Sequence, residues 1–313
     1  MDDASVPQGR RFGGEDLPAA LRPYLLEVYE QYLPAPPGGR HRFAMSATTT
    51  PNLNVTLEGA GYVVMPAAYG GGTVPLDPFS LAGPQAHPFA VEVASAIRGL
   101  DVLFTPVGPY ALLGVTDYGL TPGGPPPLHA VVRPSLAGAA RAWREAVLAP
   151  RPGASPEAAF AARAALIVAF LEARVPEVPP EAAFLQRAVA AIEAADGNVR
   201  VAALAEALGV SGATLRRRFA VLGMSVKVFA AVVRFRRAHN FLATTPGATW
   251  ADAVVRFGYT DQAHLVREHR RFSGAPPRRW AEEDRFFDRR LGLGAAPDGD
   301  RSEAVGGGVR RQR

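Results

Sequence analysis

Residues 197–275 carry one helix–turn–helix pattern twice, and this repeat constrains the fold more than any other feature of the chain. The first copy runs from Val201 through Gly209 to Phe219, and the second from Trp250 through Gly258 to His269. A glycine marks the turn in each copy, and a residue that can cap a helix follows shortly after it. We therefore expect two helical units of similar design in the C-terminal part of the chain.

The first copy illustrates why the pattern predicts two helices. Apolar residues recur on one face of its first helix, at Val201, Leu204, Ala205 and Leu208. Gly209 is suited to the left-handed conformation that ends a helix, and Ser211 can cap the next helix with its hydroxyl group. In that second helix, Leu215, Phe219 and Leu222 again share one apolar face.

These packing faces leave other side chains pointing outward from the second helix of each copy. The outward residues are Ala213, Arg216 and Arg217 in the first copy, and Gln262, Ala263, His264 and Arg267 in the second. In the major groove, arginine can donate two hydrogen bonds to guanine, and glutamine can pair with adenine. The pattern therefore predicts two helices that read DNA sequence.

The distribution of charge agrees with this interpretation. Residues 1–140 contain seven arginines and eleven acidic residues, a net charge of −4. Residues 196–290 contain seventeen basic and nine acidic residues, a net charge of +8. The C-terminal part should therefore attract a phosphate backbone, whereas the N-terminal part should repel it.

Composition excludes several other classes of protein. The chain has 313 residues, of which 48% are hydrophobic and 20% charged, as in globular proteins. It contains no cysteine, which excludes disulfides, cysteine-ligated zinc and the reactive thiol of an alkyl-transfer DNA repair protein. We see neither a membrane-spanning stretch nor a signal peptide, and we expect a cytoplasmic protein without a cofactor.

The organisation along the chain predicts an α+β protein. Residues 1–140 contain short β-type runs separated by Gly- and Pro-rich turns, which predicts a β-rich sensor or dimerisation domain, either a sandwich or a small barrel. We expect a single helix at residues 17–33. A helical linker is expected at 141–178, an all-α double helix–turn–helix DNA-binding domain at 179–290, and a disordered tail at 291–313. The linker helices could pair two subunits or pack on their own β domain.

The C-terminal motifs resemble those of the AraC/XylS family of bacterial transcription regulators, over roughly residues 183–280. The matching segments are Leu204-Ala205, Gly209-Val210-Ser211, Leu215-Arg216-Arg217-Arg218-Phe219, Phe257-Gly258-Tyr259-Thr260-Asp261-Gln262-Ala263-His264-Leu265 and Gly274-Ala275-Pro276-Pro277. The resemblance implies a central helix near residues 225–243 that holds both units rigidly. It also implies that Arg234 is a structural arginine within that helix.

The resemblance assigns DNA contacts residue by residue. Base contacts are expected from Ala213, Arg216, Arg217, Gln262, His264 and Arg267. Phosphate contacts are expected from Ser211, Thr214, Arg218, Thr260 and Arg270, which would strengthen binding without reading sequence. The expected partner is double-stranded DNA, with a small-molecule effector, RNA polymerase and a second copy of the chain as further candidates.

The function of the N-terminal domain is left open by the sequence. It could bind an effector, with Tyr62, Tyr69, His87 and Phe89 as candidate pocket residues, or it could serve only for protein interaction or dimerisation. A cupin-like metal enzyme is a third alternative, but its histidines (His41, His87 and His129) are widely spaced. Saturable binding of a small molecule would distinguish a sensor from an interaction module.

Overall fold

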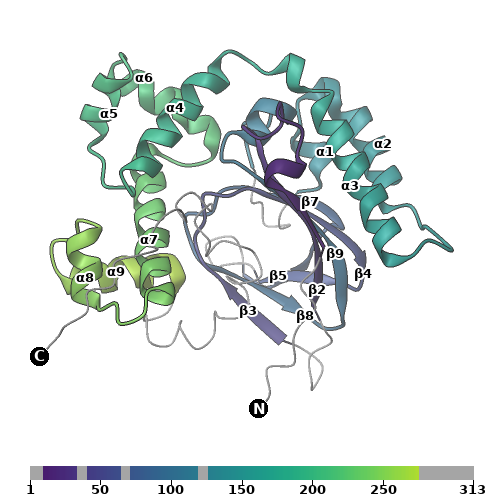
Figure 1. Ribbon diagram of the computed structural model, residues 1–313, viewed down its shortest axis with the longest axis horizontal. Helices are drawn as coiled ribbons and strands as arrows, with labels where there is room; N and C mark the ends of the chain where they lie inside the picture. Colours follow the sequence, from purple (N-terminus) through teal and green to yellow (C-terminus); the bar gives the residue numbers. More distant parts are fainter. Residues whose placement is uncertain (1–9, 34–40, 65–70, 119–125, 275–313) are drawn as a thin grey trace, which may run out of the picture.

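The computed structural model describes residues 10–33, 41–64, 71–118 and 126–274 (Figure 1). The strands are β1 (Arg11–Gly13), β2 (Leu25–Leu33), β3 (His41–Met45), β4 (Asn52–Glu58), β5 (Gly61–Val64), β6 (Thr73–Pro75), β7 (Phe79–Ala82), β8 (Phe89–Val93) and β9 (Ile97–Phe104). The α-helices are α1 (Leu128–Val131), α2 (Ala137–Leu148), α3 (Pro156–Glu172), α4 (Glu181–Ala194), α5 (Val201–Ala207), α6 (Gly212–Phe219), α7 (Val226–Thr244), α8 (Trp250–Arg256) and α9 (Gln262–Ser273). The predicted tail at 291–313 lies outside the described residues.

The strands form two antiparallel sheets. One has the order β1-β2-β9-β4-β7, and the other has the order β3-β8-β5-β6. Residues from both sheets line the same cavity, so the two sheets face each other (Figure 1). The predicted α+β fold, with a β-rich N-terminal part and an all-helical C-terminal part, is thereby confirmed.

The five-stranded sheet has its more apolar face turned away from the other sheet. Side chains alternate along a strand, and in β4 Leu53 and Val55 are fully buried in the core shared with the helices. The alternate residues Asn52, Asn54 and Thr56 line the cavity between the sheets. The sheet therefore turns polar side chains toward the cavity and apolar side chains toward the core that it shares with the helices.

Helices α2 and α3 cover the outer face of the five-stranded sheet. Trp143 of α2 meets Phe79 of β7 edge-on, with 5.1 Å between ring centroids, and stacks on Phe170 of α3 at 4.0 Å. All three belong to the hydrophobic cluster that includes the buried face of β4. Of the two alternatives for these helices, the structure shows packing on their own β domain.

The helix predicted at residues 17–33 is wrong, because residues 17–24 form turns rather than a helix. Residues 25–33 form β2, which pairs along its length with β9. The buried Leu17, Leu21 and Leu25 are spaced as on a helix, but Pro23 removes a backbone donor within the segment and disfavours a continuous helix. The eight-residue partner strand β9 is distant in sequence, so local spacing could not reveal it.

The structure also bears on membrane and metal binding. Within residues 10–33, 41–64, 71–118 and 126–274, no helix is both long and apolar enough to span a bilayer. Over the same ranges, no group of three or more His, Asp or Glu side chains is placed to hold a metal ion. The cupin-like metal enzyme therefore gains no support from the described part of the chain.

Asp101 is a buried acidic residue in the cavity between the two sheets. It lies on β9, is fully buried and lines the cavity. Burial raises the pKa of its carboxyl group from 3.8 to about 6, and the nearby polar groups of Asn52, Tyr29 and Asn54 oppose part of this rise. The folded state therefore binds this proton more tightly than the unfolded chain does.

Replacing Asp101 by asparagine should stabilise the protein at neutral pH. Because the pKa is raised on folding, the stability of the wild type is highest below the unfolded pKa of 3.8 and falls as the pH rises to about 6. Above that range the ionised carboxyl should cost about 1–3 kcal/mol, which Asp101→Asn would recover. Denaturant unfolding at about pH 7.5 and about pH 4 should show a large gain at the higher pH and a small one at the lower. An equal gain at both would contradict this explanation.

Candidate nucleic-acid interface

The first helix–turn–helix unit consists of α5 and α6. Gly209 has a φ of +68° in the turn, as the sequence predicts. Ser211 caps α6 by accepting a hydrogen bond from the backbone N–H of Thr214 at 3.1 Å. Phe219 is fully buried and meets Phe229 of α7 edge-on, with 5.2 Å between centroids. These contacts fix α6 against the helix that follows it.

The outer face of α6 presents two arginines to solvent. Ala213, Arg216 and Arg217 are all exposed. Arg218 is half-buried instead, with its Nε 3.3 Å from the carboxylate of Glu181 and its guanidinium 4.6 Å from the ring centre of Phe184. Arg218 is therefore held by α4, and a phosphate contact would compete with this ion pair.

The second unit consists of α8 and α9. Thr249 and Asp252 form a reciprocal capping box at the start of α8. Gly258 follows α8 with a φ of +67°, and a Cβ atom at this position would lie only 2.4 Å from the side chain of Asn198. Asp261 caps α9 by accepting from the backbone N–H of His264 at 2.6 Å. The turn therefore requires glycine for both conformation and space.

The candidate DNA-contacting residues of the second unit divide into two groups. Thr260, Gln262, Arg267 and Arg270 are exposed. His264 is half-buried, with its Nδ1 3.0 Å from the hydroxyl of Thr260 and its Nε2 3.4 Å from the carboxylate of Glu268. Because both ring nitrogens have partners within the protein, a base contact by His264 would require it to exchange one of them.

A buried ion pair joins the second recognition helix to the central helix α7. Arg234 of α7 donates to Glu268 of α9 at 2.5 Å, and Glu268 is buried. The Arg234 guanidinium also lies 4.7 Å from the ring centre of Tyr259. Glu268 is therefore the partner of Arg234 in its expected structural role. The sequence did not reveal this pair, because the two residues lie 34 positions apart.

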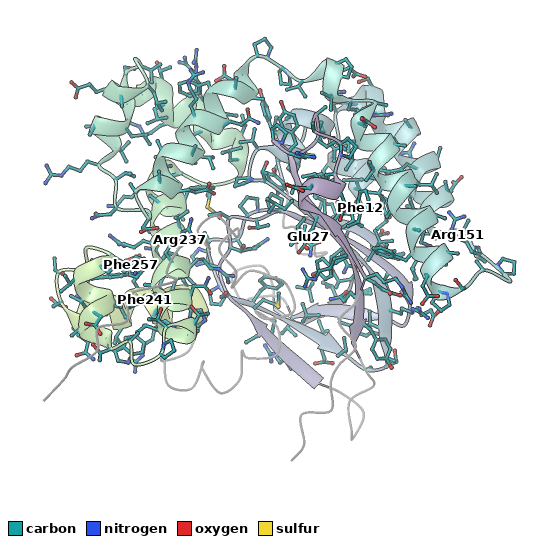
Figure 2. The ribbon with its side chains drawn as sticks, viewed as in Figure 1. Phe12, Glu27, Arg151, Arg237, Phe241 and Phe257 are labelled. Carbon is teal, nitrogen blue, oxygen red and sulfur yellow. The ribbon has the colours of Figure 1, made fainter. Side chains whose placement is uncertain are left out.

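Further contacts secure both units to α7. Arg237 lies with its Nε 3.4 Å from the carboxylate of Asp196, just before the first unit. Phe241 meets Phe257 at the end of α8, with 5.7 Å between ring centroids (Figure 2). Figure 1 shows the two units at opposite ends of α7. The two recognition helices are therefore parts of one packed body.

The N-terminal domain contacts this body beside α9. The backbone N–H of Ala47 donates to the carbonyl of Phe272 at 2.8 Å, and Arg236 donates to the hydroxyl of Ser46 at 2.9 Å. Ala47 is fully buried, in a cluster with Val232, Phe235 and Phe272. The segment that follows β3 is thus fixed to both the central and the second recognition helix.

The structure describes three of the four residues predicted for an effector pocket, and one of these three lines a cavity. Phe89 lines the cavity between the sheets. Tyr62 does not line it, because it alternates along β5 with the cavity residues Gly61 and Val63 and faces the other side. His87 is exposed in the loop before β8, and Tyr69 lies outside the described residues. The sequence missed the polar inner residues, including Asp101, since aromatic content was its only guide to a pocket.

Removing Arg234 should destabilise the protein by about 3–5 kcal/mol, because it leaves the buried Glu268 carboxylate without its cation. Replacing both residues together, as Arg234→Met with Glu268→Leu, should recover most of that loss, since apolar side chains fill the site without a buried charge. Urea unfolding of the two variants measures both changes. If the double variant were as unstable as Arg234→Met alone, shape rather than charge pairing would explain the loss of stability.

Comparison with known proteins identifies the C-terminal domain. Residues 204–283 match the family model described as "Helix-turn-helix domain". No curated protein matches the sequence. Among solved structures, the chain is similar to ToxT from Vibrio cholerae in its P21 crystal form, with 9% identity and a TM-score of 0.40 over 78% of this chain and 97% of that one. The unsaturated fatty acid-bound ToxT of strain SCE256 gives 8% identity and a TM-score of 0.41, over 80% and 95%.

The family model and the geometry of the two units lead to the same result. The match includes both recognition helices and the whole of α7 between them. Only the first residues of α5, those before 204, lie outside it. The C-terminal part is therefore a helix–turn–helix domain, as the motifs indicated. The match and the geometry of the two units support a DNA-binding transcription regulator.

Proposed function

We propose that the chain regulates transcription at a specific DNA sequence, in response to a small molecule bound by its N-terminal domain, since residues 204–283 match a helix–turn–helix domain model. Helices α6 and α9 are the proposed reading elements, inserted into neighbouring major grooves of one duplex. The observation that carries this proposal is the pair of exposed, arginine-bearing helix faces attached to one central helix.

The proposed contacts follow the exposure of the side chains. Arg216, Arg217, Gln262 and Arg267 are proposed to read bases, because each is exposed and can donate to base edges. Ala213 can offer only an apolar contact, for example to a thymine methyl group. Phosphate contacts are proposed for the five residues Ser211, Thr214, Arg218, Thr260 and Arg270, with Arg218 exchanging its partner on binding.

The proposed effector response uses the contact between the domains. Met45 lines the cavity at the end of β3, and the next two residues, Ser46 and Ala47, bind α7 and α9. A ligand that moves Met45 would therefore act directly on the segment beside the second recognition helix. RNA polymerase and a second copy of the chain remain candidate partners, without an observation that assigns a surface to either.

Selection from random duplex DNA with the full chain should enrich one sequence family with two recognised segments. Affinity for the selected site should fall at least about tenfold between low and physiological salt, because binding releases counterions from the phosphates. The measurement is a series of equilibrium binding titrations at several salt concentrations. Failure to enrich any sequence, or salt-independent binding, would contradict the proposed function.

Arg216→Ala should cost about 1–3 kcal/mol of binding energy on the selected site and relax its preference at one base pair. Arg270→Ala is the control, since it removes the same type of side chain from an exposed position that is proposed to contact phosphate. The control should weaken binding to selected and random DNA equally. Equal losses for Arg216→Ala on both DNAs would show that Arg216 does not read a base.

A second set of measurements addresses the alternative that the N-terminal domain serves only for protein interaction. In that case no small molecule should bind residues 10–118 saturably or change the affinity of the chain for its DNA site. Self-association that changes with deletion of these residues, without any ligand effect, would favour the interaction module.

A further inference from the structure

The cavity between the two sheets has one polar wall and one apolar wall. Its volume is about 100 Å³. The polar wall comes from the five-stranded sheet, through Gln31, Asn52, Asn54, Thr56, Ser80 and Asp101. The opposite wall is apolar and comes from the four-stranded sheet, through Met45, Val63, Phe89 and Val91. The cavity therefore suits a molecule with one polar end and an apolar body.

The polar wall contains an acidic group with an unused oxygen. Asp101 is fully buried, and its Oδ1 accepts from Asn54 at 3.4 Å, while its Oδ2 has no hydrogen-bond partner. The Oδ1 atom of Asn52 is also buried without a partner. Among the described residues, the hydroxyl donor that acts on the Asp101 carboxyl is that of Tyr29, which faces Asp101 across β2 and β9. At least one of the two acceptors is therefore left without a donor, and a buried acceptor without a donor is unfavourable.

The negative charge of Asp101 also has no opposite charge among the described residues that line the cavity. Among the described residues that line the cavity, it is the one titratable group, and none is Arg, Lys or His. Its pKa of about 6 leaves most of the carboxyl ionised at neutral pH, and the nearby charge that acts on it is the like charge of Glu27. Buried charges in proteins are normally paired with an opposite charge.

We propose that this cavity binds a small organic ammonium compound, with its ammonium group on Asp101 and its apolar part against Val63, Phe89 and Val91. The proposal rests on the proposed function and names the chemical class of the effector. An ammonium group carries three donors, enough for Asp101 Oδ2, Asn52 Oδ1 and one further oxygen. An anion of the same shape would be repelled, and a neutral alcohol would leave the carboxylate without a counter-charge.

The size of the cavity limits the compound. An apolar cavity of about 150 Å³ accommodates benzene, so a cavity of about 100 Å³ suits an apolar body of about four or five non-hydrogen atoms. Suitable probes are therefore cyclopentylamine, cyclopentanol and cyclopentanecarboxylate, which share one ring and differ in the charge of the substituent.

The test compares these three probes on the full chain at neutral pH, by NMR of the methyl groups of Met45, Val63 and Val91. Cyclopentylamine should bind at least about tenfold more tightly than cyclopentanol, and the carboxylate should bind most weakly. The advantage of the amine should vanish in Asp101→Asn. It should persist in Glu58→Gln, which removes an exposed carboxylate from the neighbouring strand β4.

Three outcomes would overturn the proposal: equal or tighter binding of the carboxylate, survival of the amine advantage in Asp101→Asn, or no shift of these methyl signals by any probe at about 10 mM. The comparison among probes uses the wild-type chain, so it does not depend on how well the variant folds. DNA selection on the same preparation distinguishes failure of this inference from failure of the proposed function. If specific DNA is selected without an amine preference, this inference fails and the proposed function stands; if an amine binds but no DNA is selected, the proposed function fails.

Discussion

Helix α7 has to pack against three partners at once, and the arrangement of the whole chain depends on that constraint. Its first half contributes Phe229 and Val233 to the core of the first helix–turn–helix unit. Its second half contributes Ala238 to the core of the second unit. Between them, Val232 and Phe235 pack against the N-terminal domain. A change in the pitch or length of α7 would therefore move both recognition helices and the domain contact together.

The five-stranded sheet of the β domain has the opposite arrangement, because its polar side chains face the cavity and its apolar side chains face away from it. Helices α2 and α3 make this arrangement stable by covering the apolar face of the five-stranded sheet. The interior can then carry polar side chains such as Asn54 and Asp101, at a cost in stability that a bound molecule would offset. The hydrophobic core and the cavity thus lie on opposite faces of the five-stranded sheet, so a substitution on one face need not disrupt the other.

The helical part was predictable because its determinants are local. The glycines at the two turns, the capping residues Ser211 and Asp261 and the apolar faces are all visible within short windows of sequence. Contacts between distant residues were not predictable. Examples are the pairing of Arg234 with Glu268 and the pairing of β2 with β9, which makes residues 25–33 a strand rather than a helix. Among the candidate pocket residues, Phe89 lines the cavity and Tyr62 does not, since the face of a strand that lies inward depends on which helices cover the other face.

The hydrogen bond from Ala47 to Phe272 gives the last turn of α9 a cap that belongs to a different domain. The last carbonyls of a helix have no partner within the helix itself, so Phe272 relies on this donor for a bond that the second unit does not supply. Since the donor is a backbone N–H, substitutions of the Ala47 side chain leave it in place, and only proline removes it. Separation of the domains would consequently release the final turn of α9 to fray, and the length of that helix would report whether the two halves of the chain are in contact.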